Sequence, residues 1–226
     1  MIGVFDSGAG GRFALAELRR LSPDADIVFL ADEKNAPYGT KSQAELKRLV
    51  KADIEALLSF GCEKILMACC TASTVWDSLS EKEREISVPI IEPTVLEALR
   101  ISKNKRIGIL STEATRKSEV FACEILKREP HANIVSVASG ELVSLAECGE
   151  RDGALSEQGA ITVKKSVSGF VGSGIDTLIL GCTHFAYFEN TIKDILRVSV
   201  VNSARVGAYR MLEYARAEHG VTRILG

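Results

Sequence analysis

The chain has 226 residues, long enough to build two small hydrophobic cores. Apolar residues make up 46% and charged residues 26%, and the formal net charge of −2 gives no electrostatic reason to expect nucleic acid or an anionic membrane as a partner. No apolar run approaches the roughly 18 residues of a membrane span, and the N-terminus lacks the basic start of a signal peptide. We therefore expect a cytoplasmic globular protein.

Short apolar segments alternate with amphipathic ones along the first hundred residues. The spacing predicts helices over 11–21 and 41–60 and a third from about residue 72, with a loop at 35–40 where Pro and Gly are frequent. The apolar segments between them are predicted strands, at 2–5, 26–32, 64–68 and 88–93.

The same alternation begins again near residue 105. Predicted strands lie at 105–111, 133–139, 176–181 and 198–203. Predicted helices lie at 116–128, 142–149, 155–172, from residue 183 onward, and at 205–218. The apolar runs are continuous, which is typical of strands covered on both faces, so the pattern predicts parallel sheets in an α/β fold.

The two halves of the chain have similar patterns. The opening strands begin at Ile2 and Ile107, and strands that end in cysteine reach Cys69 and Cys182. We predict two similar α/β domains with mainly parallel sheets, related by a pseudo-two-fold axis, with the active site in the cleft between them. Residues 1–97 plus about 204–226 are assigned to the first domain and 98–203 to the second. The last strand and helix are candidates to fold back onto the first half.

Polar residues collect where the predicted strands end. In open parallel sheets, ligands bind outside the carboxyl ends of the strands, so these residues are expected to face one cleft. They are Asp6-Ser7, Asp32, Cys69-Cys70-Thr71, Glu92, Ser111-Thr112, Ser139, Cys182-Thr183-His184 and Asn202-Ser203.

The glycine-rich segment DSGAGG at 6–11 does not fit the usual phosphate-binding patterns. A dinucleotide fingerprint would need a third glycine where Phe13 stands, and Asp6 would repel a pyrophosphate. The segment is either a simple tight turn or a helix N-terminus suited to a carboxylate.

The six cysteines are expected to be free thiols, because a chain this rich in apolar residues does not need a disulfide framework. A zinc site is disfavoured: Cys69 and Cys70 are adjacent, and Cys182 and His184 are only two residues apart. We expect no metal.

Cys69 and Cys182 suit acid–base chemistry. Each precedes an apparent helix, whose dipole would favour a thiolate. A thiolate on one face of a carbon atom can remove a proton while a thiol on the opposite face supplies one. Two such thiols across a cleft would invert a stereocentre with neither metal nor organic cofactor, and His184 and a carboxylate would set their protonation.

Six motifs occur in an order and spacing that resemble the glutamate racemase family. They span the chain from Ile2 to about Arg210. The motifs are IGVFDSGAGG at 2–11, PYGT at 37–40, ACCTAS at 68–73, EPTV at 92–95, TEATRKS at 112–118 and LGCTHF at 180–185.

The resemblance implies a cofactor-independent enzyme that interconverts L- and D-glutamate, commonly a homodimer, and that supplies D-glutamate for peptidoglycan. It implies that Cys69 and Cys182 are the catalytic thiols. Asp6 and His184 would be supporting acid–base residues, and Glu147 matches a family glutamate with a similar role.

The resemblance also implies a binding site for a small acidic amino acid. The residues at positions that bind its carboxylates and amine are Ser7, Pro37, Tyr38, Gly39, Thr71 and Thr183. Cys70 stands at a further such position, where the family has asparagine, and a thiol is a poorer hydrogen-bonding group than an amide. Two alternatives therefore stay open: a racemase of aspartate or another acidic amino acid, and a regulatory protein that binds an acidic amino acid with weakened turnover.

Overall fold

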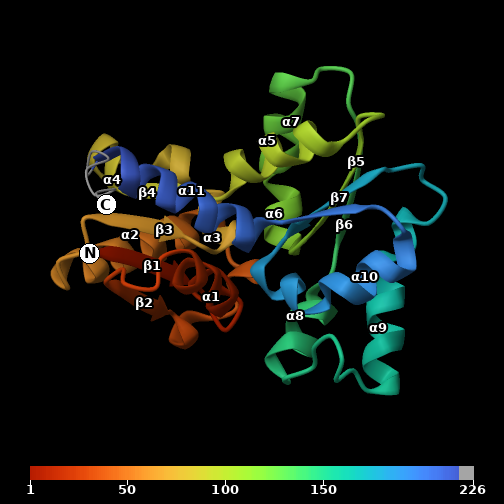
Figure 1. Cartoon of the computed structure of the whole chain (residues 1–226), viewed down its shortest axis with the longest axis horizontal. Helices are drawn as coiled ribbons and strands as arrows, with labels where there is room; N and C mark the ends of the chain where they lie inside the picture. Colours follow the sequence, from red (N-terminus) through yellow and green to blue (C-terminus); the bar gives the residue numbers. More distant parts are fainter. Residues whose placement is uncertain (219–226) are drawn as a thin grey trace, which may run out of the picture.

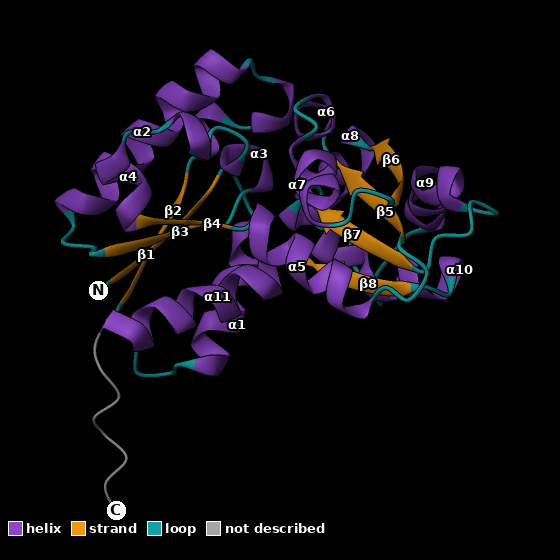
Figure 2. Ribbon diagram, turned by 90° about the horizontal axis from the view of Figure 1, so that it is seen from above, coloured by secondary structure: helices purple, strands orange, loops and turns teal. Residues whose placement is uncertain are grey.

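The computed structural model describes residues 1–218, and side chains as far as residue 213. It contains two four-stranded sheets in which all paired strands run parallel (Figures 1 and 2). The first has the order β2 (Ile27–Ala31), β1 (Ile2–Asp6), β3 (Lys64–Met67), β4 (Ser87–Pro89). The second has the order β6 (Asn133–Ala138), β5 (Arg106–Ser111), β7 (Thr177–Gly181), β8 (Ser199–Asn202). The matching orders confirm the prediction of two similar α/β domains.

The helices that accompany the first sheet begin with α1 (Gly11–Leu21) and the long α2 (Gln43–Ser59). Helix α2 starts where the Ser42 hydroxyl accepts a hydrogen bond from the Glu45 backbone N–H, as an N-cap does. Short elements complete this half: η1 (Glu33–Asn35), η2 (Tyr38–Thr40), α3 (Cys70–Ser73), η3 (Trp76–Ser78) and α4 (Glu81–Ile86). Helix α5 (Ile91–Ile101) then leads to the second sheet.

The helices that follow α5 cover both faces of the second sheet, except that the closing helix, α11, returns toward the first sheet. In chain order they are α6 (Glu113–Lys117), α7 (Val120–Arg128), α8 (Gly140–Glu147), α9 (Glu157–Val167), η4 (Ser168–Phe170), η5 (Thr183–Phe188), α10 (Glu189–Leu196) and α11 (Ser203–Glu218). None of the helices within residues 1–218 combines the length and apolarity needed to cross a membrane.

One apolar core joins the two sheets. It contains residues of both sheets, such as Val4 and Ile109, together with residues of α1, α5, α7 and α11 that lie between them (Figure 2). A second core packs α2 on the outer face of the first sheet, and a third packs α8, α9 and α10 on the outer face of the second. Both sheets are thus covered on both faces, which accounts for the continuous apolar runs of the strands.

The end of the chain differs from the prediction in one respect. Strand β8 pairs with β7 and stays in the second sheet, so only α11 returns to pack against α1, β3 and β4. The division of the chain at residue 97 remains a proposal, because that position falls inside α5 and residues 219–226 lie outside the described part.

The strand predicted at 88–93 is wrong beyond its first residues. Strand β4 ends at Pro89, and Ile91 already begins helix α5. Pro93 does not prevent this, because it lies in the first helical turn, where the backbone N–H would have no partner within the helix.

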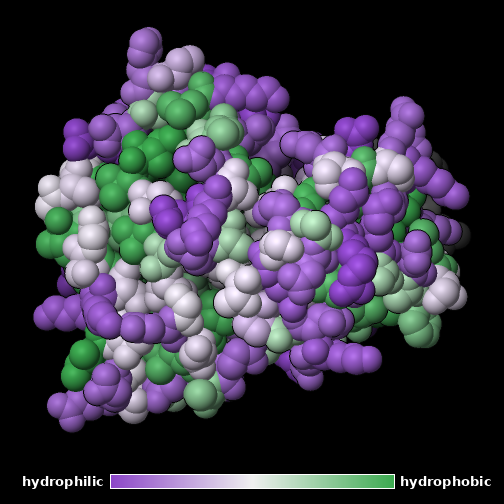
Figure 3. Space-filling model, turned by 180° about the vertical axis from the view of Figure 1, so that it is seen from behind, coloured by the Kyte–Doolittle hydropathy of each residue, from purple (hydrophilic) through white to green (hydrophobic). Residues whose placement is uncertain are grey.

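Polar and charged residues cover much of the surface, with apolar residues grouped between them on the face shown in Figure 3. Several large apolar side chains are exposed, among them Phe60, Ile161 and Val171. Scattered exposed residues of this kind are common on soluble proteins.

Glycines allow the two domains to approach each other closely. A Cβ atom on Gly10 would lie 2.3 Å from Thr183 Oγ1 and 2.8 Å from the His184 backbone nitrogen. A Cβ atom on Gly39 would lie 2.9 Å from the Cβ of Thr112. The glycine-rich segment after β1 is therefore more than a tight turn, because it makes room for the loop that follows β7.

We predict that Gly10→Ala destabilises the protein by about 1–3 kcal/mol, the usual cost of forcing extra atoms into a packed region. Urea unfolding would measure it. Gly140→Ala is the matched control, since no atom lies within 4 Å of its added Cβ, and it should change stability by less than about 0.5 kcal/mol. Equal effects of the two substitutions would contradict the close approach at Gly10.

Candidate active site

The carboxyl ends of the central strands of both sheets meet at one buried site. Asp6 ends β1, Cys69 follows β3 and caps α3, and Cys182 follows β7. Asp6 is fully buried, and Cys69 and Cys182 are 5% and 7% exposed. The site is closed, so a substrate can reach the thiols only if the domains or their loops move apart.

The Cys69 thiol lies in a polar but enclosed setting. Its Sγ lies 3.5 Å from the Ser7 hydroxyl and accepts a hydrogen bond from the Ala72 backbone N–H, also at 3.5 Å. Burial, followed by the nearby charge of Asp6, raises the pKa of Cys69 to about 12. The backbone N–H of Ala72 in the short helix α3 acts in the opposite direction and lowers the pKa, but desolvation outweighs it.

The second thiol belongs to a short chain of side chains. Cys182 Sγ lies 3.7 Å from Nδ1 of His184, and Nε2 of His184 lies 2.5 Å from Glu147 Oε1. When Glu147 is ionised, Nε2 must carry the ring proton, which leaves Nδ1 free to accept the thiol proton. The structure therefore brings together three residues that the sequence singled out separately.

The helix expected from residue 183 onward begins as a 3₁₀ segment, η5, and becomes an α-helix only at Glu189, where α10 starts. Burial raises the pKa of Cys182 well above its ordinary value, and the charges of Cys70 and Cys69 raise it further. Thr183, the residue after Cys182, donates to Asp6 in the first sheet, so the cysteines that follow β3 and β7 lie at one site, where a charge on one thiol would oppose a charge on another.

Asp6 links the two domains through hydrogen bonds. Its carboxyl group accepts hydrogen bonds from the Gly8 backbone N–H and from the Thr183 hydroxyl, both at 2.9 Å. Burial raises the pKa of Asp6, whereas His184 and these two donors act in the opposite direction. The predicted binding residue Thr183 thus also holds the two strand ends together.

A cluster of hydroxyl groups forms a second link between the domains. The hydroxyl of Thr71 lies 3.0 Å from that of Thr112 and 3.1 Å from that of Thr115. Gly39 packs against the same Thr112. Thr115 was not among the predicted site residues, although its spacing of three residues from the N-cap residue Thr112 is typical of hydroxyls that meet at a helix start.

The side chains of two predicted binding residues form hydrogen bonds with other groups of the protein. The hydroxyl of Tyr38 lies near Asp32 and Asp53, so only the backbone of the Pro37–Gly39 segment is free to bind a ligand. The Cys70 thiol donates a hydrogen bond to the Ser203 hydroxyl at 3.2 Å. Asp53 was missed from the sequence because it is an acidic residue within the apolar face of α2.

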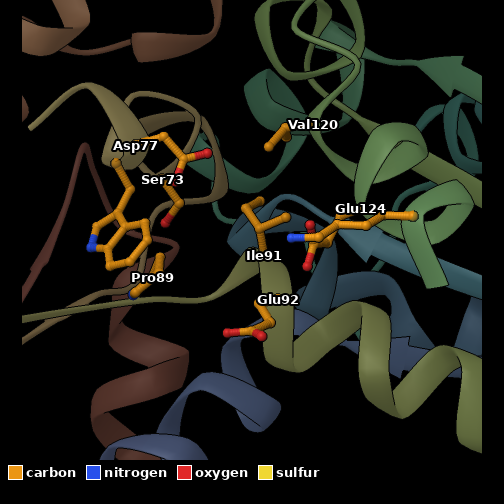
Figure 4. Close-up of a pocket in the computed structure, with 9 residues that line it drawn as sticks. Ser73, Asp77, Pro89, Ile91, Glu92, Val120 and Glu124 are labelled. Atoms are coloured by element: carbon orange, nitrogen blue, oxygen red, sulfur yellow. The ribbon is translucent and has the colours of Figure 1, made fainter. Parts of the chain in front are cut away.

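Glu92 does not join the thiol site. It lies in the first turn of α5, forms an ion pair with Arg128 and lines a separate cavity of about 180 Å³ (Figure 4). Neither active-site thiol lines this cavity, whose wall also includes Trp76, Ile91 and Glu124. The expectation that every polar strand end faces one cleft is therefore wrong for Glu92.

Comparison with known proteins agrees with this geometry. The sequence pattern of the family described as Asp/Glu/hydantoin racemase matches residues 14–211. The chain is 38% identical over 221 residues to the glutamate racemase of Aquifex aeolicus, covering 96% of this chain and 84% of that one. Its structure resembles that of glutamate racemase from Francisella tularensis in complex with D-glutamate, with a TM-score of 0.87, 28% identity, and coverage of 100% and 84%.

A more distant structure shares the fold alone. The aspartate racemase of Picrophilus torridus matches with a TM-score of 0.66 at 20% identity, covering 95% of this chain and 93% of that one. The chain belongs to the Asp/Glu/hydantoin racemase family. It is an amino-acid racemase, and the resemblance to glutamate racemases is confirmed.

The closed site predicts slow alkylation of its thiols. Iodoacetamide at pH 7.5 should modify the exposed Cys123 and Cys148 at least about tenfold faster than Cys69 and Cys182, because burial and a raised pKa both suppress the reactive thiolate. Peptide mass spectrometry would measure the rates, and the difference should vanish in denaturing urea. Equally fast modification of all four cysteines in the folded protein would contradict the closed site.

Proposed function

We propose that this racemase interconverts L- and D-glutamate, with Cys69 and Cys182 alternating as base and acid and with no cofactor. The observation that carries the proposal is the placement of the two thiols at corresponding strand ends of two matching sheets, in one shared electrostatic environment. The names of its relatives support glutamate as the substrate. We propose further that it acts in the cytoplasm and supplies D-glutamate for peptidoglycan.

The reaction in this scheme moves one proton off and another onto the α-carbon. A thiolate takes the α-proton and leaves the electron pair on the carbon, beside the carboxylate. The opposite thiol then donates its proton to the other face of that carbon, so that the product is the other enantiomer. At the end the base has become a thiol and the acid a thiolate, and the reverse reaction uses them in exchanged roles.

The protonation of the thiols sets the cost of starting this reaction. A thiol with a pKa of about 12, as for Cys69, needs about 5 kcal/mol to ionise at pH 8. The ammonium group of a bound amino acid would reduce this cost, because a nearby positive charge favours the thiolate. We infer that substrate binding itself helps to activate the base.

The neighbouring side chains are suited to moving these protons. His184, held by Glu147 at 2.5 Å, presents Nδ1 to the Cys182 sulfur and can take its proton. Asp6 lies close enough to Cys69 for its charge to raise the thiol pKa, so the carboxyl favours the protonated thiol. These are the acid–base roles that the resemblance implied for Asp6, His184 and Glu147.

Substrate binding is proposed to use the hydroxyl and backbone groups around the thiols. Ser7 lies against Cys69, Thr183 against Asp6, and Thr71 within the hydroxyl cluster between the domains. The backbone N–H groups of Tyr38 and Gly39 would supply further donors to a carboxylate.

We also propose a homodimer. The support for it is the resemblance to glutamate racemases, which implies that the enzyme is commonly a homodimer. Static light scattering would test it, and a monomeric mass at micromolar concentration would contradict it.

Each catalytic thiol should be indispensable. We expect Cys69→Ser and Cys182→Ser each to lower kcat by at least about 100-fold in both directions, since a serine hydroxyl is a far weaker acid than a thiol. Rates would be measured by polarimetry, with α-deuterium incorporation in D₂O as a second readout.

Cys123→Ser is the matched control for these variants, because Cys123 is an exposed thiol outside the site. It should racemise glutamate at the unchanged rate. Normal racemisation by either active-site variant would rule out the two-thiol scheme. Failure of the unaltered protein to exchange the α-proton of glutamate would leave the two alternatives, a racemase of another acidic amino acid or a regulatory protein, and exchange with aspartate would distinguish them.

The substitution at Cys70 provides the test of substrate identity. If its thiol leaves a polar group of glutamate without a partner, Cys70→Asn should raise kcat/KM for glutamate by roughly 10- to 100-fold, equivalent to about 1–3 kcal/mol. Glutamate and aspartate should be compared for both proteins. Faster turnover of aspartate by the unaltered protein would favour the alternative substrate.

A further inference from the structure

An acidic side chain is buried in the apolar face of α2. Asp53 is 6% exposed and shares this face with Leu46, Leu49, Ile54 and other buried apolar residues. A buried carboxylate is costly unless it is paired or protonated. The carboxyl group of Asp53 must therefore either be paired with hydrogen-bond donors or carry a proton.

The hydroxyl of Tyr38 lies between two carboxyl groups. Its oxygen is 2.6 Å from Asp32 Oδ2 and 2.8 Å from Asp53 Oδ2. A tyrosine hydroxyl has one proton and can donate it to only one of them. The other short contact needs a proton on the carboxyl group, or two oxygen lone pairs would face each other.

The surroundings indicate which carboxyl group carries that proton. Both carboxyl oxygens of Asp32 accept hydrogen bonds from the side-chain amide of Asn35, at 2.9 and 3.0 Å, so Asp32 has a second donor besides Tyr38. Among the described residues, the charges that act on Asp53 are those of Asp32 and Asp6, both acidic. The arrangement is therefore a chain in which the Asp53 acid donates to Tyr38 and Tyr38 donates to the Asp32 carboxylate.

The raised pKa of Asp53 agrees with this assignment. Burial is the largest cause, the charges of Asp32 and Asp6 add to it, and the pKa reaches about 7. The titratable groups facing Asp53 are Asp6 at the end of β1, Asp32 after β2 and Tyr38 in η2. On α2 itself, the nearby Lys51 pairs instead with Glu83 of α4 at 3.2 Å.

The chain of hydrogen bonds ends at a segment that borders the active site. Tyr38 is 1% exposed and packs in the same apolar core as Cys69. It begins η2, which contacts α3 after Cys69 and α6 of the second domain. Gly39 of η2 packs against Thr112. The Tyr38 side chain thus anchors the backbone that lies beside the thiol site.

We propose that Asp53 is a positioning residue: as a neutral acid it holds Tyr38, and through it the η2 backbone, in the geometry that binds substrate. Ionisation of Asp53 places two carboxylates around a single hydroxyl proton and releases this anchor. The inference rests on the proposed function in one respect, which is that η2 contributes to binding of the acidic amino acid.

The variant Asp53→Asn tests the proposal, because its amide still donates to Tyr38 but cannot ionise. In the unaltered protein, KM for glutamate should rise by up to about thirtyfold from pH 6 to 8.5, as the competent fraction falls above a pKa of about 7. In Asp53→Asn, KM should stay flat over this range, while the pH profile of kcat is the same in both proteins. Asp53→Leu, which cannot donate, should have a raised KM at every pH.

A second readout does not depend on activity. In the folded protein Asp53 keeps its proton up to about pH 7, whereas in the unfolded chain an aspartic acid loses its proton near pH 4. The stability that this group confers therefore falls as the pH rises from about 4 to about 7. The urea midpoint of the unaltered protein should therefore fall relative to Asp53→Asn from pH 4 to 7 and run parallel above. Asp24→Asn, at an exposed aspartate, should show no such difference.

The outcomes separate the two proposals. If Asp53→Asn keeps the pH dependence of KM, or if its urea midpoint runs parallel to that of the unaltered protein throughout, Asp53 is not the neutral anchor. If the unaltered protein does not racemise glutamate at all, the proposed function fails, and the urea comparison still decides whether Asp53 is protonated.

Discussion

The hydrogen bond from the Thr183 hydroxyl to the buried Asp6 carboxyl is the contact on which the site depends. Asp6 ends β1, one of the two central strands of the first sheet, and Thr183 follows β7, one of the two central strands of the second. Burying a carboxyl group without partners is unfavourable, so this hydrogen bond holds the two strand ends next to each other. Gly10 permits this approach because any side chain there would collide with Thr183. These two contacts therefore also fix the positions of Cys69 and Cys182, which follow β3 and β7.

The closed site favours the protonated form of its acidic groups. Burial raises the pKa of Asp6, Cys69 and Cys182, and of the more distant Asp53. Because these groups also repel one another when charged, adding a negative charge to any of them is unfavourable. A zwitterionic amino acid would bring an ammonium group into this region. That ammonium group would favour the thiolate form of a nearby cysteine, since opposite charges stabilise each other.

Much of this architecture could be predicted from the sequence. The continuous apolar runs located all eight strands of the described chain, and the cysteines after two of them indicated the site. Helix α5 was missed because Pro93 resembles the end of a strand, although a proline in a first helical turn loses no helical hydrogen bond. The helix expected from about residue 72 is only the short α3, whereas the one expected from residue 183 begins as the 3₁₀ segment η5 and continues as α10.

The contacts between the domains could not be predicted in the same way. The meeting of Thr71 with Thr112 and Thr115 joins segments about 40 residues apart, and no local pattern specifies it. Asp53 gave a local signal, an acid where the helical spacing requires an apolar residue, but that spacing alone does not identify a partner for it. The hydrogen bond between Asp53 and Tyr38 could not be predicted, because it depends on how η2 lies beside α2.

The central claim is that two thiols, one from each domain, act on opposite faces of one carbon atom. A crystal structure of the protein with bound D-glutamate tests it most directly. The account predicts the sulfurs of Cys69 and Cys182 on opposite sides of the α-carbon, each within about 4 Å, close to the distance of reacting atoms. A complex in which both sulfurs lie on the same side, or in which either is out of reach of the α-carbon, would contradict it.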